Sequence, residues 1–488
     1  MLLILMIVPL LSAFFSLIQP RSRKTRLTVL VLSAIIHNGL VFSFWVTRPD
    51  ALWKGFLALD DIGLLFLSIT STLFTLISIY GVGYLTQTQR HIPKHEALLC
   101  ACLSLFLSAM TLVTISQNLE LIWVAIEATT LSSAPLIYFH RSPHSLEATW
   151  KYFMICSVGI ALALLGNFFL AVSTAQAGIN NPSMLLSDLI IKAPLFHIPW
   201  LKAAFLFLLV GYGTKMGLAP FHTWLPDAHS EAPSFVSALL SGALLNCAFV
   251  GILRVHQVCV AAGLSTFTQT NFQLLGLLSM AFAAAFILNQ ADYKRMLAYS
   301  SVEHMGILSL SIGLGGGALF GGMFHAVNHS LTKAMLFLLS GNILIAYRSR
   351  LTKVVSGMRR TLPYSSMLWL IGFFAITGIP PFGTFVSKLL ILKAAFEQGQ
   401  IITAILCLVF LALIFVGMVG IFLKMVYAET SSPKQSEGPN PEGTVAREPL
   451  WSLLPPLCLA VLVLLLGIYM PPVLKSNLES ITLILTGP

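Results

Sequence analysis

Lys215-Met216-Gly217-Leu218-Ala219-Pro220-Phe221 and Gly378-Ile379-Pro380-Pro381-Phe382 interrupt two long apolar segments and share the pattern Gly-[Leu/Ile]-x-Pro-Phe. Glycine and proline break a helix and free backbone carbonyl groups, which is tolerable at membrane depth only where protein or water satisfies those groups. Lys215 precedes the first break, whereas Lys388 follows the second. This opposite order is typical of two halves related by inverted topology, so we expect an ion path with two related half-sites. The predicted helix breaks lie at Gly217, Pro220, Gly378, Pro380 and Pro381.

The composition of the chain is that of a membrane protein. Of its 488 residues, 57% are hydrophobic and only 9% are charged, and its apolar stretches are long enough for helices to cross a bilayer. These stretches are continuous and do not alternate, which excludes a β-barrel and predicts an all-α polytopic membrane protein. The net charge of +10 does not indicate nucleic-acid binding, because the basic residues lie in short loops without interleaved aromatic residues.

The hydropathy pattern predicts about fourteen spans, each near the ~20 residues that a transmembrane helix needs. They cover residues 1–19, 27–47, 61–85, 97–116, 118–139, 148–174, 201–225, 232–256, 271–290, 297–314, 318–346, 363–396, 401–427 and 449–470. We expect the first of these to remain as a span, since it lacks the basic region and the cleavage site of a signal peptide. If the loops rich in Lys and Arg are cytoplasmic, 18 of the 28 basic residues lie inside, 6 outside and 4 within spans. Both termini are then predicted to lie outside.

Glu127 lies near the middle of the fifth predicted span. An ionisable group at that depth costs several kcal/mol and is usually partnered or functional. Lys215 is the nearest plausible partner in the same half of the chain. Burial disfavours the charged form of either group and proximity to the other favours it, so a pair whose separation changes can load and eject a proton. The alternative is a static ion pair that locks two helices together.

His325, His329 and Lys333 recur every four residues in the span at 318–346. This spacing places them on one helical face with steps of ~6 Å, which side-chain length and a water can bridge. Because imidazole accepts and releases protons near neutral pH, the pattern predicts a proton wire. A zinc site competes with this interpretation, but no Glu follows His325 as in HExxH and no third ligand is evident. A pair of hydrogen-bonded core histidines is the third interpretation.

The second half of the chain offers further titratable groups. Lys388 follows the second break and is predicted to serve the outer half of the path. Glu303 and His304 lie near the predicted cytoplasmic start of the tenth span, where they either admit protons or pair with Lys294 or Arg295 at the membrane surface. The additional positions that we assign to the path are Lys151, Asn246, Glu303 and His304.

Three features are predicted to carry no chemistry. The loop at 222–233 contains His222, Asp227, His229 and Glu231, but its Ser-Glu-Ala-Pro end is typical of helix capping. The polar segment at 431–443 is rich in Pro, Gly and Ser and is predicted to be a flexible cytoplasmic loop. The seven cysteines all lie in apolar segments without a CxxC pattern, so we expect no disulfide, haem or iron-sulfur role.

Four stretches of sequence resemble one family across essentially the whole hydrophobic chain. They are residues 215–242, 293–308, 324–342 and 378–392, which contain KMGLAPFHTWLPDAHSEAP, YKRMLAYSSVEHMGIL, FHAVNHSLTKAMLFLLSGN and GIPPFGTFVSKLLIL. The chain resembles the antiporter-like proton-translocating subunits of NADH-quinone oxidoreductase, energy-converting hydrogenases and multisubunit cation/proton antiporters. The Glu in YSSVEHMG is most similar to component F of hydrogenase 4, because subunits of NADH oxidoreductases more often have Ser there.

The resemblance implies fourteen core helices and two inverted five-helix repeats, each with a half-channel. It implies that Glu127 and Lys215 modulate the first half-channel, that His325, His329 and Lys333 form the connecting relay, and that Lys388 is the exit group. One position departs from the pattern of the family, since relatives commonly have Lys or His where this chain has Asn246. The expected organisation is an N-terminal three-helix segment at 1–96, half-channels at 97–256 and 257–427, a flexible loop at 428–448, and a C-terminal helix and tail at 449–488.

These observations predict a membrane subunit of a redox-driven proton pump of the group 4 hydrogenase or formate hydrogenlyase type. The chain shows no nucleotide loop, cluster ligands or haem site, so we expect no cofactor in it, and a nickel-iron centre and iron-sulfur clusters in partner subunits. Expected partners are other membrane subunits, a hydrophilic redox module and the lipid bilayer, with H⁺ or Na⁺ as the ion. The alternatives are a subunit of NADH-quinone oxidoreductase, a subunit of a sodium/proton antiporter, and a proton-inert scaffold.

Overall fold

The computed structural model describes residues 1–18, 22–87, 92–179, 183–428 and 448–487. Within these residues the chain is almost entirely helical, so the predicted all-α class is confirmed. The predicted flexible loop at 428–448 lies outside the described residues except for its two end residues. The helices are α1 (Leu2–Ile18), α2 (Arg23–Ser43), α3 (Asp61–Gln87), α4 (Pro93–Ile115), α5 (Leu119–Ile137), α6 (Pro143–Gln176), α7 (Leu186–Lys192), α8 (Ile198–Met216), α9 (Trp224–Glu231), α10 (Ser234–Leu239), α11 (Leu245–Ala261), α12 (Ser265–Ile287), α13 (Tyr293–Leu314), α14 (Gly317–Tyr347), α15 (Met358–Thr361), α16 (Pro363–Thr377), α17 (Gly383–Glu397), α18 (Ile401–Tyr427), α19 (Leu450–Ile468) and α20 (Pro472–Thr486).

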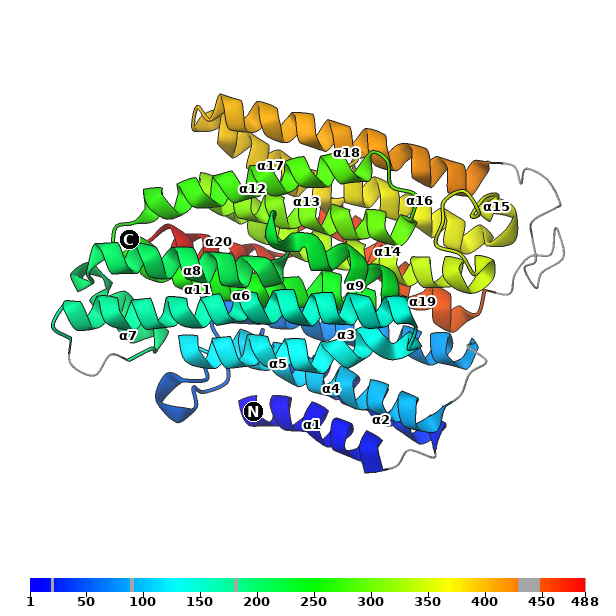
Figure 1. Cartoon of the computed structure of the whole chain (residues 1–488), viewed down its shortest axis with the longest axis horizontal. Helices are drawn as coiled ribbons and strands as arrows, with labels where there is room; N and C mark the ends of the chain where they lie inside the picture. Colours follow the sequence, from blue (N-terminus) through cyan, green and yellow to red (C-terminus); the bar gives the residue numbers. More distant parts are fainter. Residues whose placement is uncertain (19–21, 88–91, 180–182, 429–447, 488) are drawn as a thin grey trace.

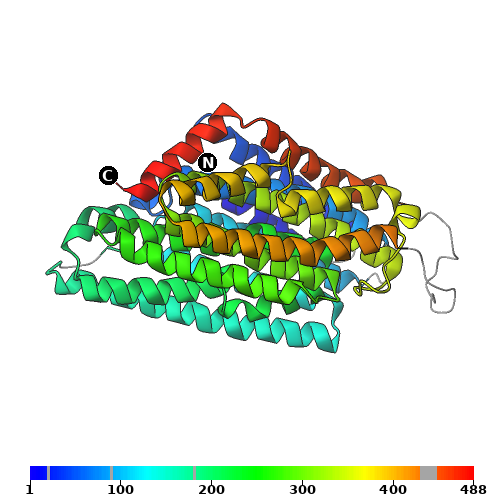
Figure 2. The same ribbon diagram turned by 90° about the horizontal axis from the view of Figure 1, so that it is seen from above.

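The helices form one bundle whose long members run side by side along its length (Figure 1). Eleven helical stretches of the described chain are long and apolar enough to cross a membrane, and α1 and α16 are shorter apolar helices. The protein is therefore a multi-pass membrane protein. Helix α18 lies at one edge of the bundle and α1 at the opposite edge in Figure 1. Seen from above, α18 lies across the face of the bundle that is turned to the viewer (Figure 2).

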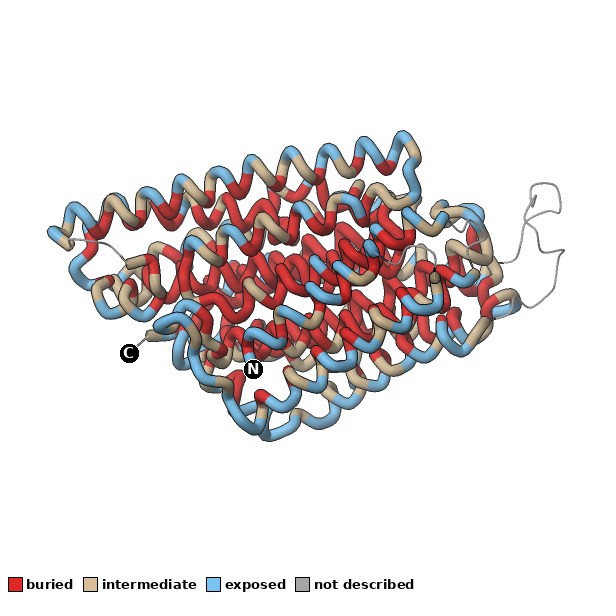
Figure 3. Tube along the Cα trace, turned by 90° about the horizontal axis from the view of Figure 1, so that it is seen from below, coloured by how far each residue is buried: buried red, intermediate tan, exposed pale blue. Residues whose placement is uncertain are grey.

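Burial separates the interior helices from the outer ones. The tube in Figure 3 is buried through the middle of the bundle and alternates between buried and exposed along its margin. Every residue of helix α14 from Ala318 to Ile343 is buried except Phe320, which is partly buried. A helix that is enclosed on every side can carry polar groups away from lipid, so α14 is the natural element for an internal path.

Local sequence signals set where several helices begin. Helix α6 starts with a capping box in which the side chains of Ser142 and Ser145 each accept the other residue's backbone N–H. The Asn118 side chain caps α5, and the Asp292 side chain caps α13 by accepting from the amides of Lys294 and Arg295. Helix α20 was not predicted as a span. It packs on α3, α11 and α14.

Both predicted interruptions are present. Helix α8 ends at Gly217, which has φ +84°, and α16 ends at Gly378, which has φ +82°. Glycine suits this left-handed conformation because a Cβ would clash there. The chain becomes helical again at α9 after the first interruption and at α17 after the second.

Small residues bring α6 and α8 into close contact beside the first interruption. A Cβ on Gly211 of α8 would approach the Gly159 carbonyl oxygen of α6 to 2.5 Å. Only glycine permits this close approach of the two helices. The close packing of α6 on α8 brings the Tyr152 side chain of α6 against Lys215 of α8.

Candidate functional site

Lys215 lies in a pocket of hydroxyl groups, which we call the first lysine site. The side chain is completely buried. Its Nζ donates hydrogen bonds to Thr130 Oγ1 of α5 at 2.6 Å and to the Tyr152 hydroxyl of α6 at 2.7 Å. The Tyr152 hydroxyl also lies 2.6 Å from Ser133 Oγ. The ammonium group is therefore held by neutral oxygens from two neighbouring helices.

Glu127 is linked to Lys215 through a threonine. Its Oε2 accepts from Thr130 Oγ1 at 3.2 Å, and its Oε1 accepts from Ser157 Oγ at 3.3 Å. Because Thr130 accepts from the lysine and donates to the carboxylate, one hydroxyl bridges the two charged groups. The two charged groups therefore make no direct ion pair, and the Thr130 hydroxyl is the group that connects them.

Lys388 of α17 forms a second lysine site with a carboxylate and two carbonyls. Its Nζ lies 3.3 Å from Glu303 Oε1 of α13, and both side chains are almost fully buried. The same nitrogen donates to the carbonyl oxygens of Ile376 and Thr377, each at 3.3 Å. The second site therefore contains a direct ion pair next to the end of α16.

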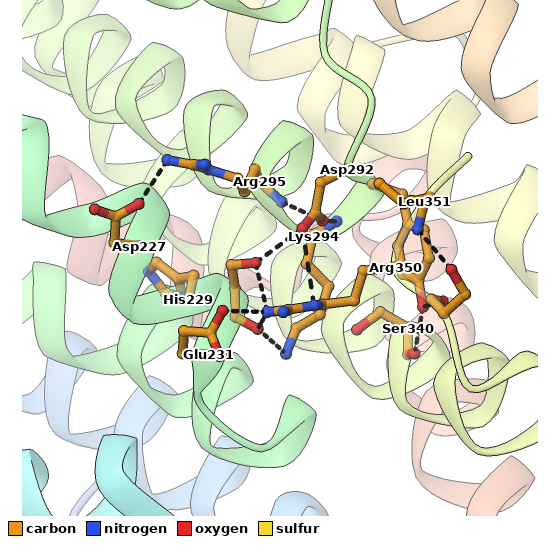
Figure 4. Close-up of polar contacts among 12 residues, drawn as sticks. Asp227, His229, Glu231, Asp292, Lys294, Arg295, Ser340, Arg350 and Leu351 are labelled. Carbon is orange, nitrogen blue, oxygen red and sulfur yellow. Dashed lines mark hydrogen bonds and ion pairs between the residues drawn. The ribbon is translucent and has the colours of Figure 1, made fainter. Parts of the chain in front are cut away.

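The predicted surface pairing of Glu303 with Lys294 or Arg295 is wrong. Because α13 begins at Tyr293, the Glu303 position lies ~15 Å along that helix, which is too deep to reach its first turn. Lys294 donates instead to the carbonyls of Ser230 and Ala232 at 3.2 and 2.7 Å. Arg295 contacts Asp227 at 2.5 Å (Figure 4).

His304 lies between the two histidines of α14. Its Nδ1 is 2.8 Å from His325 Nε2, and its ring centroid lies 5.0 Å from that of His325 and 4.8 Å from that of His329. The centroids of His325 and His329 are 6.4 Å apart. The sequence predicted that water would span this step, whereas the structure fills it with an imidazole from α13. His325 Nδ1 reaches Ser387 Oγ of α17 at 2.8 Å, beside Lys388.

Lys333 and Asn246 lie further along the same interior. Lys333 is fully buried, and its Nζ donates to the Leu297 carbonyl at 2.6 Å and to Ser300 Oγ at 2.8 Å. Asn246 of α11 donates from Nδ2 to the Gly242 carbonyl at 2.9 Å and to Ser330 Oγ at 2.8 Å. The residues Leu240–Leu244 before it form a π-helical turn, a feature frequent at functional sites. Asn246 thus joins α11 to the histidine helix α14.

The charged residues around α9 form a separate network of polar contacts (Figure 4). Arg350 contacts Glu231 at 2.6 Å and donates to the Ser230 carbonyl at 2.8 Å. Ser230 Oγ donates to Asp292 at 2.9 Å. The predicted capping role is wrong, because α10 begins without any side-chain cap. The Ser230 hydroxyl donates to Asp292 instead.

Of two further residues singled out from the sequence, Lys151 lies apart from the buried groups, whereas His229 lies near Lys333. Lys151 is half exposed and pairs with Glu147 at 2.6 Å and Asp227 at 3.1 Å. The ring of His229 is buried and stacks on Phe337 with centroids 5.0 Å apart. Among the described residues, no three His, Cys, Asp or Glu side chains are grouped so that they could hold a metal ion.

Sequence reasoning missed the neutral partners of the charged groups. Thr130, Tyr152, Ser300 and Ser387 contact the lysines or histidines directly. The only available signal was the density of hydroxyls inside apolar spans, such as Thr129-Thr130 and Ser132-Ser133 after Glu127. Hydroxyls are common in helix interfaces, so this signal could not identify which of them face a lysine.

Comparisons with known proteins identify the family from the sequence, and solved structures share the fold. Residues 116–415 match the model described as NADH:quinone oxidoreductase/Mrp antiporter, TM. A hydrogenase-4 component F homolog of Methylacidiphilum infernorum is 34% identical over 452 residues, covering 91% of this chain and 90% of that protein. The membrane-bound sulfane sulfur reductase, an archaeal respiratory membrane complex, contains a chain with a TM-score of 0.88 at 21% identity, with 99% of this chain and 97% of that chain covered. A chain of the Mrp complex from Dietzia sp. DQ12-45-1b gives a TM-score of 0.85 at 22% identity, with 100% and 99% covered.

Proposed function

Because this chain belongs to the NADH:quinone oxidoreductase/Mrp antiporter family, we propose that it is the proton-translocating membrane subunit of a redox-driven complex of the group 4 hydrogenase type. One observation supports ion translocation above the others. Each of the two helix interruptions is accompanied by a buried lysine and by a glutamate from a neighbouring helix. Buried ionisable groups at membrane depth are expensive and mark ion paths in transport proteins.

The contacts of these residues support the following proposed roles. Glu127 and Lys215 exchange a proton through Thr130 in the first half of the chain. His304, His325 and His329 carry protons along α13 and α14 between Lys333 and the second lysine site. Lys388 is the exit group, and residues 97–256 and 257–427 are the two half-channels.

The hydrogenase type is favoured by the relative at 34% identity, whose length this chain nearly covers. A subunit of NADH-quinone oxidoreductase and a subunit of a sodium/proton antiporter are the alternatives. We place the protein in the cytoplasmic membrane with both termini outside, since the positive-inside pattern puts 18 of its 28 basic residues in the cytoplasmic loops. The nickel-iron centre and iron-sulfur clusters then belong to a hydrophilic partner module.

Purification of the intact complex in mild detergent tests the proposal. Co-purification of a nickel-iron hydrogenase module is the expected result. An NADH dehydrogenase module or a set of antiporter subunits would select the corresponding alternative. Recovery of the chain without any redox or antiporter partner would contradict the proposed function.

A further inference from the structure

The second lysine site has the composition of a cation-binding site. Three oxygens surround Lys388 Nζ at 3.3 Å, namely Glu303 Oε1 and the carbonyls of Ile376 and Thr377. An N–H···O hydrogen bond usually measures about 2.7–3.2 Å, so each contact is long. The ammonium group is shared among three acceptors and is tightly bound to none of them.

The two carbonyls are available because of the consecutive prolines. In a continuous helix the carbonyls of Ile376 and Thr377 would accept from the residues four positions later, which are Pro380 and Pro381. Proline has no N–H, so the interruption leaves both carbonyls without their helical partners. Lys388 takes the place of the two missing donors.

We propose that Glu303 and the carbonyl oxygens of Ile376 and Thr377 form a binding site for the transported monovalent cation, and that Lys388 is a tethered occupant which this cation displaces. Unwound backbone carbonyls at the end of a half-helix are the ligands that transporters use for Na⁺ or H⁺. A hard cation prefers oxygen ligands of this kind. The inference rests on the proposed function and extends it to a defined ion site.

Charge balance links the arrival of the cation to the departure of the lysine. Glu303 is only 2% exposed, and a buried carboxylate without a positive partner is strongly disfavoured. When Lys388 moves away, its buried ammonium group would also lose its partner, so it leaves as a neutral amine: its proton either passes to Glu303, which becomes a neutral acid, or leaves along the path while a sodium ion binds Glu303. When Lys388 returns and takes up a proton again, it restores the ion pair and expels the cation. The site therefore alternates between two neutralised states.

Several titratable groups surround Glu303 and influence how readily it binds a cation. His304 Nε2 on α13 lies 4.0 Å from Glu303 Oε2. Lys333 of α14 and Cys407 of α18 interact electrostatically with both Glu303 and Lys388. His304 contacts His325, which reaches Ser387 next to Lys388. The histidine stack therefore ends beside the carboxylate that would receive a proton.

Infrared difference spectra of the purified complex can detect the occupant directly. Acidification should produce a carboxylic-acid carbonyl band in the wild type that is lost in Glu303→Gln. If added NaCl suppresses that band and choline chloride does not, the site also binds sodium. A band that neither salt changes assigns the site to protons alone. In Lys388→Met the band should appear at a proton concentration about tenfold lower, because no tethered ammonium competes for the carboxylate. Identical spectra of the wild type and Glu303→Gln under both titrations would overturn the proposal.

Ion flux in proteoliposomes containing the complex separates a binding site from a structural ion pair. Glu303→Gln should reduce flux at least several-fold, whereas Glu397→Gln should not, since Glu397 pairs with Lys393 on the exposed face of α17. The double variant Glu303→Lys/Lys388→Glu keeps an ion pair but moves the ammonium to α13, so we expect assembly without flux. Normal flux in this double variant would show that the pair is structural.

A parallel measurement on Glu127→Gln distinguishes the inference from the proposed function. Loss of flux in Glu127→Gln with normal flux in Glu303→Gln would leave the proposed function intact and refute the second site. Normal flux in both variants would refute the proposed function itself.

Discussion

The two lysine sites use the same residue types in different arrangements. In the first, Thr130 separates Glu127 from Lys215, and the ammonium group donates to two hydroxyls. In the second, Lys388 contacts Glu303 directly and also reaches carbonyls at the end of a helix. The first site is therefore suited to moving a proton through a hydroxyl, whereas the second is suited to exchanging one cation for another.

The position of each lysine relative to its interruption explains this difference. Side chains on a helix lean toward its N-terminus. Lys215 lies in the last turn of α8, so it leans away from the interruption and reaches α5 and α6. Lys388 lies in the first half of α17, so it leans back toward the interruption and reaches the end of α16. Whether the lysine precedes or follows the helix break in the sequence thus determines whether it can contact the backbone carbonyls at that break.

The largest expected effect is the loss of the charged groups of the first site. Glu127→Gln and Lys215→Ala should leave the complex assembled but reduce redox-coupled pumping to the background leak, because a neutral partner cannot cycle charge. Proton pumping by the reconstituted complex is the measurement. Glu120→Gln is the control, since Glu120 lies exposed at the start of the same helix. Pumping at the wild-type rate in either site variant would show that the first site is structural.

Thr130→Val tests the bridging hydroxyl that distinguishes the first site from the second. A hydrogen bond to a charged group contributes ~1.5–3 kcal/mol, so pumping should fall about ten- to a hundredfold. Thr129→Val is a matched control, because the Thr129 hydroxyl donates only to the Ile126 carbonyl of its own helix. Equal pumping rates in the two valine variants would show that Glu127 and Lys215 communicate without Thr130.

The fold was more predictable from the sequence than the site. Each of the fourteen predicted spans corresponds to helical residues, because apolar segments of that length have few other ways to satisfy their backbone in lipid. Helix α20 was not predicted as a span because its polar residues interrupt the apolar pattern. Asn477 and Ser480 of that helix both bond Asp61 at the start of α3.

The partners in the site could not be read from sequence spacing. The four-residue repeat correctly placed His325 and His329 on one face of α14, but His304 enters between them from another helix. Which helices meet depends on tertiary packing, and the contact of Glu303 with Lys388 joins residues 85 positions apart. Chemically suitable residues were therefore identifiable, whereas their pairing was not.

Asn246→Lys probes the interior between the two sites and should have an intermediate effect. The Asn246 side chain is 1% exposed, and its amide fits between the Gly242 carbonyl and Ser330. A lysine there introduces a charge without a carboxylate partner, so we expect a several-fold loss of assembly or flux. Proton flux measured across a range of pH tests this, and Asn246→Gln, which keeps a neutral amide, should be milder. Unchanged flux of the lysine variant at every pH would contradict the expectation.

The smallest expected effects come from the two glycines that end the broken helices. Gly217→Ala and Gly378→Ala each force a side chain into a left-handed conformation, at a cost of ~1–2 kcal/mol, so both should lower the thermal unfolding temperature of the complex slightly.

The surroundings of the two glycines differ. A Cβ at position 217 would meet Leu225 Cδ1 at 2.5 Å, whereas a Cβ at position 378 would lie 3.1 Å from Lys388 Cδ. Gly378→Ala should therefore also reduce ion flux, while Gly217→Ala should reduce stability with little change in flux per assembled complex. Thermal unfolding and flux measured on the same preparations would decide, and equal flux in the two variants would show that Lys388 does not depend on the geometry of its helix break.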